Sequence, residues 1–113
     1  MLASDILTPA RDILDDTDSG NYRWSNAKLL AYCGQAIQVV RRLRPESQLT
    51  AAGQPRTMTT PTATTDTLVL DAEWQVALME YVLSRAYAGE AKDEQDLARA
   101  KAHMDNFTAF VGA

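Results

Sequence analysis

Apolar residues recur every three or four positions in four stretches of the chain, and this spacing predicts α-helices. The first stretch runs from about Ser4 to Asp16 and contains Pro9. Either Thr8 caps a short helix that has Pro9 in its first turn, or a longer helix bends at Pro9. The pattern leaves both interpretations open.

The second stretch carries clear helix signals at both ends. Ser25 is a good N-cap and Pro45 cannot continue a helix, so we expect a helix from about Asn26 to Arg44, roughly 28 Å long. Its expected core-facing side is broad and consists of Leu29, Leu30, Cys33, Ala36, Ile37, Val40, Leu43 and Arg44.

Two further helices are expected in the second half of the chain. Asp71 can cap one that runs to about Gly89, and Asp93 can cap the next, whose first turn holds Glu94 and Asp96. The first of the two has an apolar surface wide enough for a central helix buried on more than one side: Trp74, Leu78, Met79, Tyr81, Val82, Leu83 and Ala86. The second has a narrower stripe: Leu97, Ala100, Met104, Phe107 and Val111.

A threonine- and proline-rich arm at residues 48–67 separates the second and third helices. Two interpretations stay open: a mobile surface loop, or a short hairpin that pairs Arg56–Thr60 with Thr67–Leu70. A loop this long is often functional or ordered by a partner. The predicted fold is therefore a mostly α single domain over residues 1–113, a bundle of three to four helices with a long extended loop or short β-hairpin between the second and third.

Composition narrows the classes of function. The chain has 113 residues, 23% of them charged, and a formal net charge of -4, whereas a sequence-independent DNA binder is usually basic. No apolar run approaches the roughly 20 residues that span a bilayer, and the first residues lack the features of a signal peptide. We therefore expect one domain that is neither a free-standing nucleic-acid module nor a membrane protein.

No residue constellation points to catalysis. Cys33 is the only cysteine and lies among apolar residues, which predicts a buried thiol and a reducing compartment. His103 is the only histidine and is expected at the surface or rim, so no His-pair or Cys–His metal motif exists. We expect no enzyme activity, no catalytic residue, no metal and no cofactor.

The acidic turn after the first helix resembles a calcium loop only in part. Asp16 and Asp18 match the first and third ligands of such a loop. Gly20 and Asn21 then break the pattern, and Ala27 stands where the bidentate glutamate is needed. A solvated turn before a capped helix explains these residues better.

A basic cluster at the end of the second helix is the main candidate contact site: Arg41, Arg42 and Arg44. It can be a solvated helix end that complements the helix dipole, a salt-bridge site for another subunit or partner, or a direct DNA contact. An acidic complement exists in Glu90, Asp93, Glu94 and Asp96. In a head-to-tail ring, the basic patch of one subunit could meet the acidic patch of its neighbour.

The two tryptophans are expected to anchor the core. Trp24 follows Tyr22 and Arg23 in a turn, so it could instead be a partly exposed interface anchor. Arg56, in the arm, completes the set of candidate contact residues.

Several segments, taken in order, resemble one known family. They are Ile13-Leu14-Asp15-Asp16-Thr17, Tyr22-Arg23-Trp24-Ser25, the helix end Leu43-Arg44-Pro45, Tyr81 to Tyr87, and Ala98 to His103 followed by Phe107 and Phe110. Their order and spacing resemble the head-to-tail adaptor (connector or head-completion) proteins of tailed bacteriophages. The sequence departs from that family in its short, threonine-rich arm.

The resemblance implies a structural virion protein. Such proteins form a ring, commonly a dodecamer, beneath the portal protein, and extend the channel for packaged DNA without sequence-specific binding. They also present a platform to the tail or nozzle protein, at the capsid–tail junction of the virion after assembly in the host cytoplasm. The candidate subunit or portal interface is then Tyr22, Arg23, Trp24, Arg41, Arg42, Arg44, Arg56, Glu90, Asp93 and Glu94.

An alternative class is a small cytoplasmic helical regulator or antitoxin-like binding module. A recognition helix rich in arginine, lysine and asparagine would favour it. The second helix has arginines only at its end, which weakens this alternative.

Overall fold

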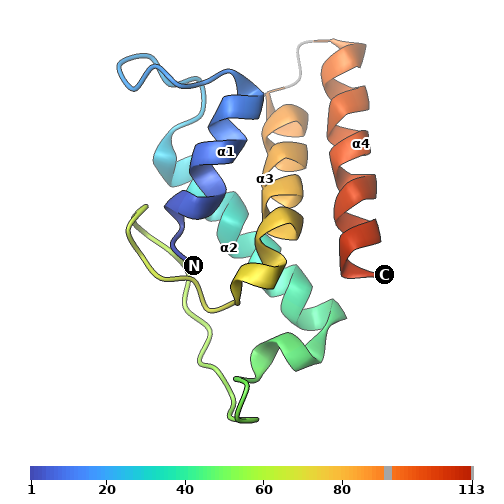
Figure 1. Cartoon of the computed structure of the whole chain (residues 1–113). Coiled ribbons are helices and arrows are strands. Elements are labelled where there is room, and N and C mark those ends of the chain that lie inside the picture. The colour runs from blue at the N-terminus through green and yellow to red at the C-terminus, as the bar shows by residue number, and fades with distance from the viewer. Residues whose placement is uncertain (91–92, 113) are drawn as a thin grey trace.

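Four α-helices form the framework of the computed structural model, which describes residues 1–90 and 93–112. They are α1 (Ser4–Leu14), α2 (Asn26–Leu43), α3 (Gln75–Gly89) and α4 (Glu94–Val111). Two 3-10 turns, η1 (Pro45–Gln48) and η2 (Ala72–Trp74), flank the arm. Figure 1 shows α3 in the middle, with α1 on one side, α4 on the other and α2 crossing behind.

The predicted central role of α3 is confirmed, because α3 packs against each of the other three helices. Its Leu78, Val82 and Leu83 are fully buried. A fully buried side chain of this size contributes about 1.5–3 kcal/mol to folding. The single core therefore forms around α3.

The longer of the two interpretations of the first helix is confirmed. α1 continues through Pro9 and ends at Leu14, where Asp15 adopts a left-handed conformation with φ 53°. Proline inside a helix removes one backbone hydrogen bond. The burial of Ile6 and Ala10 against the rest of the bundle offsets that loss. The helix ends two residues before the predicted Asp16, because the left-handed conformation of Asp15 closes it.

The signals predicted at both ends of α2 are confirmed. Ser25 Oγ accepts a hydrogen bond from the Lys28 backbone N–H at 3.1 Å, and the helix ends just before Pro45. The predicted burial of Leu43 is wrong, because its side chain is 42% exposed. The buried side of α2 includes Gly34, and the arm covers the helix there. A Cβ added to Gly34 would lie 2.9 Å from Thr60 Cγ2.

The hairpin interpretation of the arm is wrong, since the described residues contain no strand. Thr67 forms an isolated bridge with Leu2, and the Leu68 N–H donates to the Met1 carbonyl at 2.8 Å. The N-terminal residues thus occupy the pairing edge that a hairpin would need. Pro61 also lacks the N–H that a ladder requires, and it is buried.

The prediction that Asp71 caps α3 is wrong. No cap hydrogen bond comes from its side chain, and α3 begins only at Gln75, after η2. The Asp71 carboxylate instead accepts two hydrogen bonds from Arg56 Nη2, at 2.9 and 3.0 Å. Arg56 Nη1 also donates to the Val69 carbonyl at 2.6 Å, so this arginine fastens the arm.

α4 packs chiefly on α3. Asp93 caps it as predicted, accepting from the Asp96 N–H at 3.0 Å. The predicted burial of Leu97 is wrong, because it is 55% exposed: the contact face of α4 runs through Ala100 and Phe107 and turns away from Leu97. His103 lies at the rim, as expected, with Nδ1 2.5 Å from Glu80 Oε2 and its ring stacked on Tyr87.

Candidate functional site

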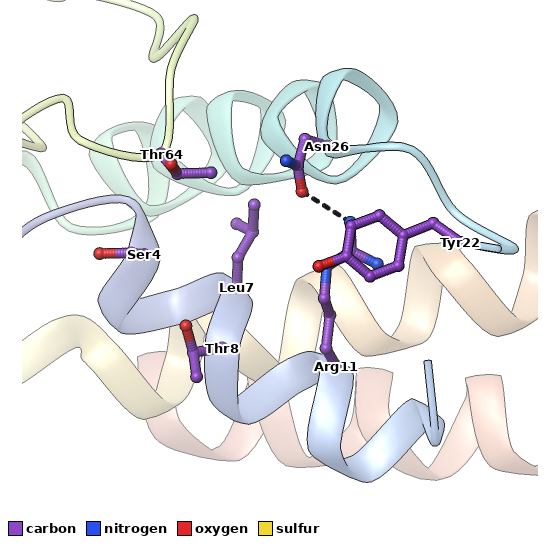
Figure 2. Close-up of a pocket in the computed structure, with 7 residues that line it drawn as sticks. All are labelled: Ser4, Leu7, Thr8, Arg11, Tyr22, Asn26 and Thr64. Atoms are coloured by element: carbon purple, nitrogen blue, oxygen red, sulfur yellow. Dashed lines mark hydrogen bonds between the residues drawn. The ribbon is translucent and has the colours of Figure 1, made fainter. Parts of the chain in front are cut away.

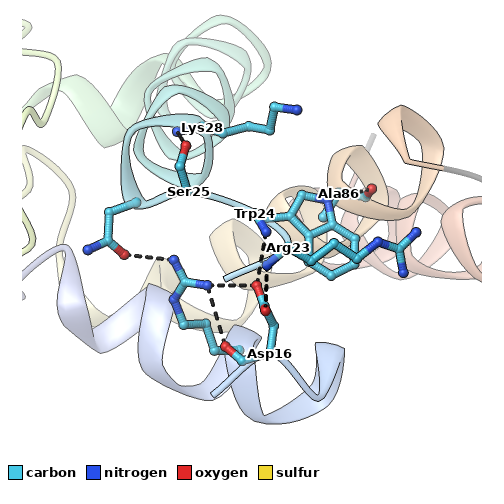
Figure 3. Close-up of polar contacts among 8 residues, drawn as sticks. Asp16, Arg23, Trp24, Ser25, Lys28 and Ala86 are labelled. Carbon is cyan, nitrogen blue, oxygen red and sulfur yellow. Dashed lines mark hydrogen bonds and ion pairs between the residues drawn. The ribbon is translucent and has the colours of Figure 1, made fainter. Parts of the chain in front are cut away.

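The turn between α1 and α2 is organised by one buried carboxylate, Asp16. It accepts hydrogen bonds from Arg11 Nη1 at 2.8 Å and from the backbone N–H groups of Arg23 and Trp24 at 2.8 and 3.1 Å (Figure 3). Arg11 is equally buried and also donates to Asn26 Oδ1 at 2.7 Å. Asp16 is therefore a structural group and not a calcium ligand. Among residues 1–90 and 93–112, no cluster of acidic, histidine and cysteine side chains could hold a metal ion.

Trp24 is a core anchor, which confirms that interpretation over a partly exposed interface anchor. Its side chain is 1% exposed and its Nε1–H donates to the Ala86 carbonyl at 3.0 Å. The Arg23 guanidinium covers the indole at 4.4 Å. Trp74, by contrast, is only half-buried and lines a shallow depression with Phe110.

Tyr22 lies at the edge of a second depression (Figure 2). The Arg11 guanidinium lies 3.4 Å from the centre of the Tyr22 ring. The depression is lined by Ser4, Leu7, Thr8, Arg11, Tyr22, Asn26 and Thr64. Because Asp16 already balances the charge of Arg11, this hollow offers no uncompensated cation to an anionic ligand.

The predicted basic cluster lies at the C-terminal end of α2. Arg44 closes the C-terminus of α4, donating to the Val111 and Gly112 carbonyls at 2.5 and 3.1 Å. Arg41 donates to Gln48 Oε1 at 3.2 Å, whereas Arg42 is exposed. In the described part of the chain, all three lack an ion pair with a carboxylate. We call Arg41, Arg42 and Arg44 the basic end.

The predicted acidic residues lie at the opposite end of α2. Arg23 Nη2 donates to the Glu90 carbonyl at 2.6 Å, which places the end of α3 beside the start of α2. The Glu90 carboxylate pairs with Lys28 at 2.8 Å, and this pairing raises the pKa of the lysine. Asp93 caps α4, and Glu94 is exposed in its first turn. Glu90 and Asp93 are thus engaged within the chain.

Three acidic residues that the sequence interpretation did not select lie near that end as well. Asp12, Asp15 and Asp18 are exposed, and none forms an ion pair in residues 1–90 and 93–112. Hydrogen bonds from the Asn21 side chain and the Gly20 N–H lower the pKa of Asp18. We call Asp12, Asp15, Asp18 and Glu94 the acidic end. Two of the four, Asp12 and Asp15, occupy outward-facing positions of α1 or its cap, a signal that helical spacing could have provided.

Cys33 is not available for chemistry in the folded chain. Its thiol is fully buried, and burial raises its pKa to about 12. We expect no labelling by a disulfide reagent at pH 8 until denaturant unfolds the chain, since the thiolate is the reactive form. Because the unfolded thiol ionises near pH 8.5, stability should also decline as pH rises from about 8.5 toward 12. Rapid labelling of the folded chain would contradict this burial.

Comparisons with known proteins supply no family: a scan against protein-family models, a search of curated proteins and a search of solved structures each found no match. Within residues 1–90 and 93–112, no helix has the length and apolar character needed to cross a membrane. We therefore base the proposed function on the distribution of charge and on the resemblance of the sequence segments described above.

Proposed function

We propose that this chain is a structural assembly subunit of a tailed bacteriophage, a head-to-tail adaptor. In this proposal it forms a dodecameric ring beneath the portal protein and offers a platform to a tail or nozzle protein. Packaged DNA passes through the ring without sequence-specific binding. The observation that carries the proposal is the separation of charge along α2: within residues 1–90 and 93–112, no ion pair is formed by Arg41, Arg42 and Arg44 at one end or by Asp12, Asp15 and Asp18 near the other.

Such a charge distribution suits a repeating assembly. Contacts between two different patches generate rings when the rotation closes, so each subunit needs two complementary surfaces. Complementary charges also set the register and speed of association, and they disfavour wrong partners. The fixed framework of four packed helices presents both ends at a constant separation, which a ring of identical subunits requires.

The net charge of -4 suits a channel for DNA. Acidic groups that face the lumen would repel phosphates, so that DNA passes without adhering. This part of the proposal predicts that acidic groups outside the subunit contacts contribute to the inner wall of the ring.

The test is to mix the purified chain with the portal protein encoded in the same genome and to image the product. We expect a ring of this chain on one face of the portal, and no such ring on images of the portal alone. A portal that is itself assembled but captures no chain would contradict the proposal, as would a genome that encodes no portal. Binding of a short DNA duplex with a steep salt dependence would favour a nucleic-acid-binding regulator instead.

A further inference from the structure

We infer that the exposed Arg42–Leu43 edge of one copy docks on the Asp12–Ile13 edge of the next copy, with Asp15 beside it. This inference rests on the proposed function, in which copies of the chain associate head to tail. It names the two surfaces that meet. The partner is a second copy of this chain.

The first edge combines exposed apolar surface with unbalanced positive charge. Leu43 is 42% exposed in the last turn of α2, and the exposed Arg42 precedes it. Arg41 and Arg44 flank this pair, and within residues 1–90 and 93–112 they donate to neutral oxygens. Glu46, which follows Pro45, is exposed and is the nearest acidic residue in sequence, so the edge stays basic on balance.

The second edge combines exposed apolar surface with unbalanced negative charge. Ile13 is 47% exposed near the end of α1, between the exposed Asp12 and Asp15. Arg11 is the closest basic residue in sequence, and it is buried and paired with Asp16. Within residues 1–90 and 93–112, Asp12 and Asp15 form no ion pair, so a positive group of a second copy can pair with this edge. The two edges match in kind, each with one large aliphatic side chain, and they are opposite in charge.

The two edges lie too far apart to touch within one copy. The hydrogen bond from Arg11 to Asn26 ties the end of α1 to the start of α2. Leu43 lies at the other end of α2, about 25 Å away at 1.5 Å per residue. A two-fold dimer could also place the Arg42–Leu43 edge of each copy on the Asp12–Ile13 edge of the other, but it would use both edges at once and stop at two copies. Like edges facing each other would bring like charges together, which is unfavourable. Head-to-tail association avoids this repulsion, and each copy then uses both edges.

The two most exposed large apolar side chains of the described residues, Leu97 and Phe110, do not combine these features. Leu97 is followed by the small residue Ala98, and its neighbour Asp96 is buried and bonded to Arg99. Phe110 lies in the depression beside Trp74, where Glu73 is the one charged residue of the lining. Neither place has a matching surface of opposite charge at the far end of the bundle.

Cysteine cross-linking tests the contact directly. The double variant Ile13→Cys with Leu43→Cys should form a ladder of covalent dimers, trimers and larger species on oxidation, either free at high concentration and low salt or on the portal. Each single variant should form no ladder, because its new thiol faces Leu43 or Ile13 of the next copy instead of a second thiol. The buried Cys33 can stay in place, and the parent chain should form no ladder. Ile13→Cys with Leu97→Cys, an equally exposed position on α4, is the matched control and should form no ladder.

Charge reversal provides the second measurement. Adding Arg42→Glu to the cross-linking pair should slow ladder formation by about tenfold or more, because like charges across a contact are strongly unfavourable. Adding Asp12→Arg and Asp15→Arg to that variant should restore it. Arg85→Glu, at an exposed arginine of α3, should change little.

The outcomes separate this inference from the proposed function. A ring on the portal without any ladder, in either condition, overturns the contact and leaves the proposed function standing. A ladder in the free chain without portal association supports the contact and contradicts the proposed function. Absence of both overturns both.

Discussion

Replacing Asp16 by alanine is expected to lower the free energy of unfolding by about 4 kcal/mol, a large share of the roughly 5–15 kcal/mol that holds a domain folded. The change leaves the buried Arg11 guanidinium without its counter-charge. It also removes the acceptor of the Arg23 and Trp24 backbone N–H groups. These losses affect the junction of α1, α2 and α3 together.

Urea unfolding followed by circular dichroism measures this effect. The matched control is Asp18→Ala in the same turn, an exposed position where we expect a much smaller change. If the alanine variant does not fold, Asp16→Asn provides the measurement, since it keeps one acceptor oxygen while it loses the charge and replaces the second acceptor by a donor NH2 group. Equal stability of the Asp16 and Asp18 variants would contradict the structural role of the buried carboxylate.

Replacing Trp24 by alanine is expected to cost about 4 kcal/mol, the usual range for a fully buried tryptophan. The loss comes from the cavity left beneath α3 and from the lost hydrogen bond to the Ala86 carbonyl. The edge contact with Tyr87 is lost as well. Trp24→Phe should recover most of the packing and leave the Ala86 carbonyl without its partner.

Trp74→Ala is the matched control, because the chain has two tryptophans and this one is only half-buried. We expect it to lose clearly less stability than Trp24→Ala in the same urea titration. The remaining tryptophan reports unfolding by fluorescence in each variant. A Trp24 variant that keeps its stability but loses ring assembly would mean that Trp24 acts at an interface and not in the core.

Local signals predicted most of the helical framework. Ser25 and Asp93 cap their helices through hydrogen bonds to residues three positions later, so the sequence alone contains both partners. Pro45 stops α2 for an equally local reason. The position of α3 at the centre followed from the width of its apolar surface. Periodicity and capping depend on near neighbours, and the sequence displays near neighbours directly.

The wrong predictions all depend on residues far along the chain. Asp71 was expected to cap a helix, but Arg56 takes its carboxylate. The hairpin was excluded by pairing between residue 67 and the N-terminus. Leu43 and Leu97 fit the helical period of the core, yet neither faces another element closely enough to be covered. Local propensity indicates which caps, strands and buried faces are possible, and tertiary packing determines which of them form.

The sequence predicted which residues belong to the candidate site, but it did not predict how they are arranged in space. The cluster of Arg41, Arg42 and Arg44 is visible in the sequence. The sequence does not show that Arg44 reaches the carbonyl of Val111, 67 positions away. The sequence also offers no reason to expect Asp12 and Asp15 near the start of α2, where the Arg11–Asn26 hydrogen bond places the end of α1. Opposite charge at opposite ends is therefore a property of the fold.

The pairing of Met1 and Ala3 with Leu68 and Asp66 has a consequence for synthesis. α1 has 11 residues, too few for a stable isolated helix, and it packs on α3. Its partners leave the ribosome only after most of the chain has been made, and closing so long a loop costs conformational entropy. The hairpin of α3 and α4 joins neighbouring segments and can form without that cost. We therefore expect α1 to dock only after α3 has emerged. Until then the nascent chain carries an exposed, apolar segment.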